Sequence, residues 1–192
     1  MAVIIDSSSS LSEKRLADVE KRLRCRLPEQ YRQFLLEFNG GKPTPNGIVI
    51  PQAQNALAVR AFFGVDNDKD FDLLSEHKAM RHRLPSNMVP IAEDGSGNCV
   101  ALCVAGRDVG AVYFWDHELE VDEGSSPTHQ NLFKIADDFD TFLNKLQDLP
   151  EVELAEEDDD DDVVWFDPEF HQEQVRAGNT TGPFKGRFER HE

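Results

Sequence analysis

Apolar residues recur at helical spacing near the start of the chain. Three of them follow Ser12, whose hydroxyl can cap a helix, and they are Leu16, Val19 and Leu23. A second helix is predicted to begin at Leu27-Pro28, because proline is tolerated in a first turn. The predicted buried face of this helix comprises Tyr31, Phe34, Leu35 and Phe38. Asn39-Gly40-Gly41 should end it, because these residues readily adopt left-handed conformations.

The middle of the chain alternates short runs of branched and aromatic residues with turn residues. The predicted strands are 47–51, 57–64, 88–92, 99–104 and 109–115. The last three follow one another through turns, which favours an antiparallel meander. A weaker apolar pattern predicts a helix over 70–83. An amphipathic closing helix is predicted from Ile135, Phe139, Phe142, Leu143 and Leu146. This order of elements predicts an α+β fold.

Charge restricts the partners that the chain can bind. Acidic residues outnumber basic ones by 37 to 20, which leaves a formal net charge of −17. Nucleic-acid binding relies on clustered Lys and Arg that release counterions, so we expect no nucleic-acid partner. An anionic membrane surface would repel the chain as well, so we expect no membrane partner. The charge permits a basic protein partner.

The uneven distribution of this charge predicts a domain boundary at Pro150. Residues 150–192 hold 14 of the 37 acids but only 4 of the 20 bases. We therefore predict one folded domain over 1–149, followed by 150–192 as an acidic linker and an aromatic-containing C-terminal tail. The tail is too apolar for a plain disordered segment, and it could dock on the body or on a partner. Docking on the body is the simpler expectation.

Basic residues gather in the predicted N-terminal helical region. They are Lys14, Arg15, Lys21, Arg22, Arg24 and Arg26. We predict that residues 151–162 lie near this basic patch, because their charges are complementary. Trp165 and Phe166 are predicted to bury against the body, because such an apolar cluster is costly to leave exposed.

Localisation is predicted from features that the sequence lacks. No run approaches the roughly 20 apolar residues that span a bilayer. Asp6 interrupts the apolar start of the chain, so we expect no signal peptide. Cys99 and Cys103, if they share a strand, lie about 13 Å apart on one face, which is too far for a disulfide. We expect these two cysteines and Cys25 to be reduced in a cytoplasmic protein.

Two acidic stretches imitate ligand-binding loops without completing them. Asp66-Asn67-Asp68-Lys69-Asp70 resembles the first half of a calcium loop, but Phe71 and His77 stand where glycine and a bidentate glutamate are required. Glu93-Asp94-Gly95-Ser96-Gly97 lacks the lysine of a phosphate-binding loop, and its acids would repel phosphate. We interpret the first stretch as a solvated acidic turn and the second as a hairpin turn.

The histidines do not suggest a catalytic or metal site. In Asp116-His117-Glu118, strand alternation would place the two acids opposite the histidine, so they would not converge as in a catalytic triad. The six histidines lack the companion spacing of a zinc site. We therefore expect no catalytic residue, no metal and no cofactor.

Four segments carry motifs that can be matched to a known family. The segments are residues 27–41, from Leu-Pro to Asn-Gly-Gly; Val89-Pro90-Ile91-Ala92 with Gly95-Ser96-Gly97-Asn98; Gly110-Ala111-Val112-Tyr113-Phe114-Trp115-Asp116-His117-Glu118; and Ala136-Asp137-Asp138-Phe139 through Phe142-Leu143. In this order and spacing they resemble the SMI1/KNR4 family of the SUKH superfamily, over about residues 15–147. Asp138 departs from the family, which often has serine there, and residues 150–192 fall outside the resemblance.

The resemblance implies a central, mostly antiparallel sheet with helices packed around it. It also implies function without catalysis, because bacterial members are mainly immunity proteins that bind and neutralise toxins, often nucleases or deaminases. A basic toxin would be attracted to acidic loops. The candidate partner-binding residues are Asp66, Asp68, Asp70, Asp72, Glu93, Asp94, Asp116, Glu118, Glu120, Asp122 and Glu123. The alternative is a regulatory or scaffold protein, as fungal members are, that acts through protein contacts without a toxin.

Overall fold

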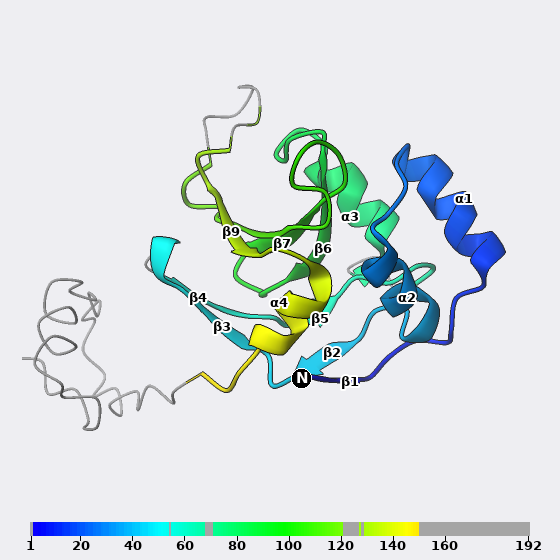
Figure 1. Cartoon of the computed structure of the whole chain (residues 1–192), viewed down its shortest axis with the longest axis horizontal. Coiled ribbons are helices and arrows are strands. Elements are labelled where there is room, and N and C mark those ends of the chain that lie inside the picture. Colours follow the sequence, from blue (N-terminus) through cyan, green and yellow to red (C-terminus); the bar gives the residue numbers. More distant parts are fainter. Residues whose placement is uncertain (1, 54, 68–70, 121–126, 128, 150–192) are drawn as a thin grey trace, which may run out of the picture. The chain divides into compact units, whose positions relative to one another are not determined.

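The computed structural model describes residues 2–53, 55–67, 71–120, 127 and 129–149. Its helices are α1 (Glu13–Leu23), α2 (Glu29–Glu37), α3 (Leu73–Met80), α4 (Phe139–Lys145) and the 3-10 turn η1 (Pro51–Ala53). Its strands are β1 (Val3–Ile5), β2 (Lys42–Thr44), β3 (Gly47–Ile50), β4 (Asn55–Ala58), β5 (Ala61–Phe62), β6 (Met88–Glu93), β7 (Cys99–Cys103), β8 (Val112–Trp115) and β9 (Leu132–Ala136). Figure 1 shows how these elements are arranged.

An antiparallel sheet with the strand order β5-β6-β7-β8-β9 forms the centre of the fold. Strands that follow one another in the sequence are neighbours in the sheet, so the predicted meander is confirmed. Two smaller antiparallel pairs, β1–β2 and β3–β4, accompany this sheet. The fold is therefore α+β with antiparallel sheets and helices around them, as predicted.

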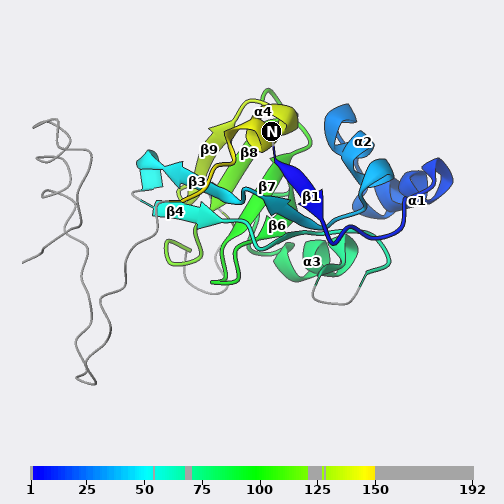
Figure 2. The same ribbon diagram turned by 90° about the horizontal axis from the view of Figure 1, so that it is seen from below.

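Side chains that alternate along β6, β7 and β8 give the central sheet two apolar faces. On one face, Val100 and Phe114 belong to the main core, which also contains residues of α1, α2 and α4. On the other face, Cys99, Cys103 and Trp115 form a second core with the end of α3. Figure 2 shows α3 and α4 on opposite sides of the sheet. The prediction that the two cysteines share one face is confirmed.

Aromatic side chains join α2, α4 and β5 in the main core. The ring of Phe34 lies 5.1 Å from that of Phe139, centroid to centroid, and 4.9 Å from that of Phe62. Tyr31, Phe34, Leu35 and Phe139 are buried, as the sequence predicts, whereas Phe38 is only half-buried. Trp115 is buried as well. Such aromatic pairs add about 0.5–1.5 kcal/mol each beyond the area that they bury.

Side chains that accept backbone hydrogen bonds fix the starts of three helices. These capping residues are Ser12 of α1, Asp72 of α3 and Asp138 of α4. Asn39 at φ 49° follows α2 and leads into Gly40 and Gly41, whose φ angles are also positive. The predicted cap at Ser12 and the predicted stop after α2 are confirmed.

The predicted strand over 57–64 is wrong, because the chain changes sheets within it. β4 ends at Ala58, and β5 covers only Ala61–Phe62. Between them, the N–H of Val59 bonds to Asn46 O beside β3, whereas the N–H of Arg60 bonds to Glu93 O at the end of β6. A continuous run of strand-forming residues does not reveal which neighbour each part will pair with.

The other predicted boundaries also shift. Ile135 lies in β9 and not in the closing helix, which begins only at Phe139 after the cap at Asp138. The helix predicted over 70–83 covers Leu73–Met80. The strand predicted over 109–115 begins at Val112, because Ala111 N–H closes a turn by bonding to Asp108 O at 2.9 Å.

Candidate partner-binding surface

The turn between β6 and β7 is built around the carboxylate of Asp94. Its Oδ1 accepts the backbone N–H groups of Ser96 and Asn98 at 2.7 and 3.1 Å, and its Oδ2 accepts the Asn98 amide at 2.7 Å. Gly95 and Gly97 have φ angles of 85° and 99°, which glycine adopts readily. The predicted hairpin turn is therefore confirmed, and Asp94 stabilises it.

Asn98 links this turn to the segment that follows β8. Its Oδ1 accepts the backbone N–H of His117 at 3.0 Å and lies 2.9 Å from His117 Nδ1. Only 8% of Asn98 is exposed, so this amide has little competition from solvent. The predicted acids at 93–94 and those that follow β8 are thereby brought to one surface.

Arginine side chains already pair with two of these acids. Arg60 contacts Glu93 at 2.9 Å, and Arg83 holds both carboxylate oxygens of Glu120, the closest at 2.7 Å. The Arg83 guanidinium also lies 4.7 Å from the centroid of the Trp115 ring. Its pKa is raised mainly by the hydrogen bond to Glu120. The arginines hold Glu93 and Glu120 in place and offset much of their charge.

Asp116 is buried, although its sequence position among acids that follow a strand predicts an exposed carboxylate. Only 7% of Asp116 is exposed, and its carboxylate accepts the backbone N–H of Glu118 at 3.0 Å. The Asn131 amide donates to the carbonyl of Asp116 at 2.9 Å. Asp116 therefore shapes the turn that follows β8 instead of presenting a free carboxylate.

The residues next to Asp116 point outward. Glu118 is exposed, and its carboxylate has no ion-pair partner among the residues that the structure describes. Leu119 beside it is 48% exposed. We use the name acidic rim for the surface formed by Glu93, Asp94, Glu118, Leu119 and Glu120.

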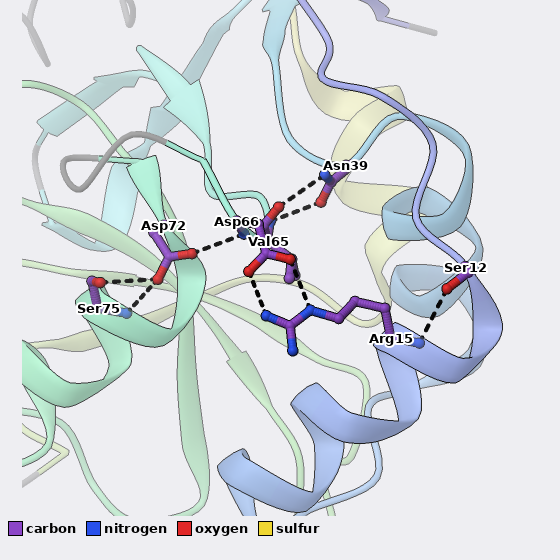
Figure 3. A network of polar contacts seen from close by, with 7 residues as sticks. All are labelled: Ser12, Arg15, Asn39, Val65, Asp66, Asp72 and Ser75. Atoms are coloured by element: carbon purple, nitrogen blue, oxygen red, sulfur yellow. Dashed lines mark hydrogen bonds and ion pairs between the residues drawn. The ribbon is translucent and has the colours of Figure 1, made fainter.

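Asp66 and Asp72 occupy a different place, between α1 and α3 (Figure 3). Arg15 of α1 donates two hydrogen bonds to the carboxylate of Asp66, one of them from Nε at 2.8 Å. These bonds, together with the charge of Arg15, hold the pKa of the Asp66 carboxyl below its usual range. Asp72 accepts the N–H of Asp66 at 3.0 Å and that of Ser75 at 2.9 Å. Both acids therefore fasten elements of the fold to one another.

The remaining predicted acids cannot be placed. Asp68, Asp70, Asp122 and Glu123 lie outside the described residues, and so does the predicted contact of 151–162, Trp165 and Phe166 with the body. Their roles stay predictions. The predicted domain boundary at Pro150 likewise stays a prediction.

Sites for small ligands are limited in the described part of the chain. No three His, Cys, Asp or Glu side chains gather there in a way that could hold a metal ion. Two shallow cavities enclose about 150 and 260 Å³, whereas ligand pockets usually measure ~300–1,000 Å³. Burial raises the pKa of the Cys25 and Cys99 thiols, which disfavours the reactive thiolate. The described helices include none that is both long and apolar enough to span a bilayer.

Comparison with known proteins identifies the family of this fold. A relative described as the SPbeta prophage-derived uncharacterized protein YokK of Bacillus subtilis (strain 168) is 27% identical over 176 residues. The match covers 80% of this chain and 86% of the relative. Residues 10–145 match the SMI1 / KNR4 family (SUKH-1). This stretch runs from just before α1 to the last residue of α4 and includes the whole central sheet. The chain therefore belongs to the SMI1/KNR4 family.

Proposed function

We propose that this protein is a non-enzymatic immunity protein that neutralises a cognate toxin by binding to it directly. Family membership over residues 10–145 is the observation that carries the proposal, since SUKH domains are commonly immunity proteins. The prophage origin given for the relative agrees with a role in competition between genetic elements. The structure supports a binding role through an acidic surface whose turns are held together by hydrogen bonds.

The net charge of −17 suggests the chemistry of the partner. A toxin that degrades or deaminates nucleic acid needs a basic surface to bind its polyanionic substrate. An acidic inhibitor is steered to such a surface and can cover it with its own carboxylates. We therefore infer that the toxin is a basic, nuclease-type or deaminase-type domain.

We place the contact on the acidic rim because of its rigidity and its composition. The hydrogen bonds that the side chains of Asp94 and Asn98 accept hold the two halves of the rim together, so little conformational entropy is lost when a partner binds. Glu118 offers a carboxylate without an internal ion pair, and Leu119 beside it offers apolar surface. Exposed apolar surface surrounded by charge is typical of protein-binding sites.

Co-expression with a toxin gene from the same locus tests the proposal. We expect the chain to restore growth of cells that produce the toxin, and we expect the purified proteins to form a stable complex. The association rate should fall steeply as salt is added, because attraction between exposed charges is screened. Unimpaired killing in the presence of the protein, for every toxin-type neighbour, would contradict the immunity function.

Charge reversal at the rim tests the location separately. Glu118→Lys should lower the association rate by roughly tenfold at low salt, because it removes steering at the contact. Glu37→Lys is the matched control, since Glu37 is an exposed acid on α2, away from the rim. Equal effects of the two variants would mean that only net charge matters and that the rim is not the contact.

A further inference from the structure

Unpaired basic side chains are concentrated on two neighbouring helices of this acidic protein. Among the described residues, the basic side chains with no carboxylate within 4.0 Å are Lys14, Arg22, Arg24, Lys78, Arg81, Arg107 and Lys145. All of these except Arg107 and Lys145 lie on α1, on α3 or at the C-cap of one of these helices. The two helices lie against each other, so their charges reinforce one another.

A groove opens between the end of α1 and the end of α3. Its apolar walls are formed by Leu23, Met80, Leu84 and Met88, and its polar walls include Arg81 and His77. No carboxylate lines it. Burial lowers the pKa of His77 and so disfavours its charged form, whereas Arg81 provides a permanent positive charge in the wall. The groove of about 150 Å³ is large enough for about one bulky side chain and is smaller than the ~300 Å³ expected of a cofactor pocket.

We propose that this groove, with the basic side chains around it, is a second binding site that accepts an acidic segment of a partner protein carrying a bulky apolar side chain. The apolar side chain packs on the outer edges of Leu23, Met80 and Leu84, each of which is at most 7% exposed, and the acidic residues beside it meet Arg81, Lys78 and Arg24. The site is distinct from the acidic rim but lies beside it, since Arg83 contacts both Met80 of the groove and Glu120 of the rim. The proposal does not depend on the toxin that we propose for the rim.

The negative net charge of the whole protein does not prevent such binding. Interactions between exposed charges are screened beyond about 8 Å at physiological salt, so the local basic surface decides what binds there. The apolar walls favour a peptide over a nucleic acid, because phosphate groups gain nothing from Met80, Leu84 or Met88. A nucleic acid is therefore the competing occupant that the test has to exclude.

Fluorescence anisotropy with the full chain tests the proposal. The probe is a labelled synthetic peptide with the sequence of residues 151–166, chosen because it combines nine acids with a Trp-Phe pair. We expect saturable binding that weakens with salt and that falls about tenfold in Arg81→Glu, because the variant puts a repulsive charge in the groove wall. A peptide with serine in place of both aromatic residues should bind several-fold more weakly, because it lacks the apolar anchor.

Lys145→Glu is the matched control, since Lys145 is an exposed base with no carboxylate within 4.0 Å among the described residues and belongs to α4, on the opposite side of the sheet from α3 (Figure 2). Retained binding in this variant supports the groove, and an equal loss overturns the proposal. A single-stranded DNA 20-mer is the competing probe. If it binds more tightly than the peptide and depends on Arg81 in the same way, the surface belongs to nucleic acid and the proposal is overturned. Absence of peptide binding to the full chain overturns it as well. Peptide binding by a chain that ends at Leu149, but not by the full chain, would assign the groove to residues 150–192 and not to a partner. Circular dichroism of each variant verifies that the fold is intact.

Discussion

The side chain of Arg32 in α2 is almost buried, and it contacts acids that lie far from it along the chain. Its guanidinium binds Glu20, and it contacts Glu13 at 2.8 Å. Only 10% of the Arg32 side chain and 14% of the Glu20 side chain are exposed. The pair joins α1 to α2 at a place where neither charge can be hydrated well, so each depends on the other.

We predict that Arg32→Ala destabilises the protein by about 2–4 kcal/mol, because it leaves Glu20 buried without its counter-charge. Urea unfolding of the variant and the wild type measures the difference. Arg26→Ala is the control, because Arg26 is exposed and contacts Glu29 only at 3.8 Å. The account of this pair would be wrong if both variants lost the same small amount of stability.

Asn39 combines a backbone role with a side-chain role. Its Oδ1 accepts the N–H of Val65 at 2.7 Å, its Nδ2 donates to Val65 O at 3.0 Å, and its φ is 49° (Figure 3). Asn39→Gly should cost about 1–3 kcal/mol by removing the hydrogen bonds, and Asn39→Ala should cost about 1 kcal/mol more through left-handed strain. Thermal or urea unfolding of the two variants checks this order, which an equal cost would contradict.

At the scale of elements, α4 depends on Asp138, whose carboxylate accepts the N–H of Thr141 at 2.8 Å. We predict that Asp138→Ala destabilises the protein by about 1 kcal/mol, whereas Asp138→Ser retains most of the cap. Urea unfolding at neutral pH measures both variants. Equal losses would show that the side chain of Asp138 does not act as a cap.

The same cap predicts a dependence on pH. Hydrogen bonds with Thr141 lower the pKa of Asp138, so its contribution is fully present above the unfolded value of ~3.9 and is lost as pH falls through the folded pKa. Asp138→Ser should therefore lose less stability than the wild type when the pH falls from about 5 to about 2. Unfolding curves across this range check it, and parallel losses in the two proteins would contradict it.

Local chemistry explains which elements could be predicted from the sequence. The cap at Ser12, the glycine stop after α2 and the β6–β8 meander depend on neighbouring residues, so the pattern reveals them. The short strands β1 and β2 were missed, because each has only three residues and pairs with a segment about forty positions away. Ile135 fitted helical spacing equally well, and only its pairing in the sheet makes it part of a strand.

The candidate site likewise has features that could be predicted from the sequence and features that could not. The sequence predicts the hairpin turn that carries Glu93 and Asp94, and in the structure Asn98 links this turn to the segment that carries Glu118 and Glu120. The sequence could not show that Glu93 and Glu120 pair with arginines, because Arg60 and Arg83 lie 33 and 37 positions away. The burial of Asp116 could not be predicted from the sequence either, because it depends on a contact with Asn131, which belongs to a later segment.

At the scale of the whole molecule, the prediction that Trp165 and Phe166 bury against the body can be tested by deletion. A chain that ends at Leu149 should lose stability in urea unfolding, because apolar contacts are removed. The fluorescence lost with Trp165 should be that of a buried indole, since the other tryptophan, Trp115, stays buried in the second core. Unchanged stability, together with the loss of a solvent-exposed indole signal, would show that this segment does not dock on the body.

The central claim is that this protein works by holding one basic toxin. Affinity purification of the tagged protein from cells that express its whole locus, followed by mass spectrometry and native mass measurement, tests it most directly. The account predicts one basic, nuclease-type or deaminase-type protein in a stoichiometric complex, and it predicts that salt and Glu118→Lys reduce its recovery. Recovery of several ordinary cellular proteins, with no toxin among them, would contradict the claim and favour a regulatory scaffold.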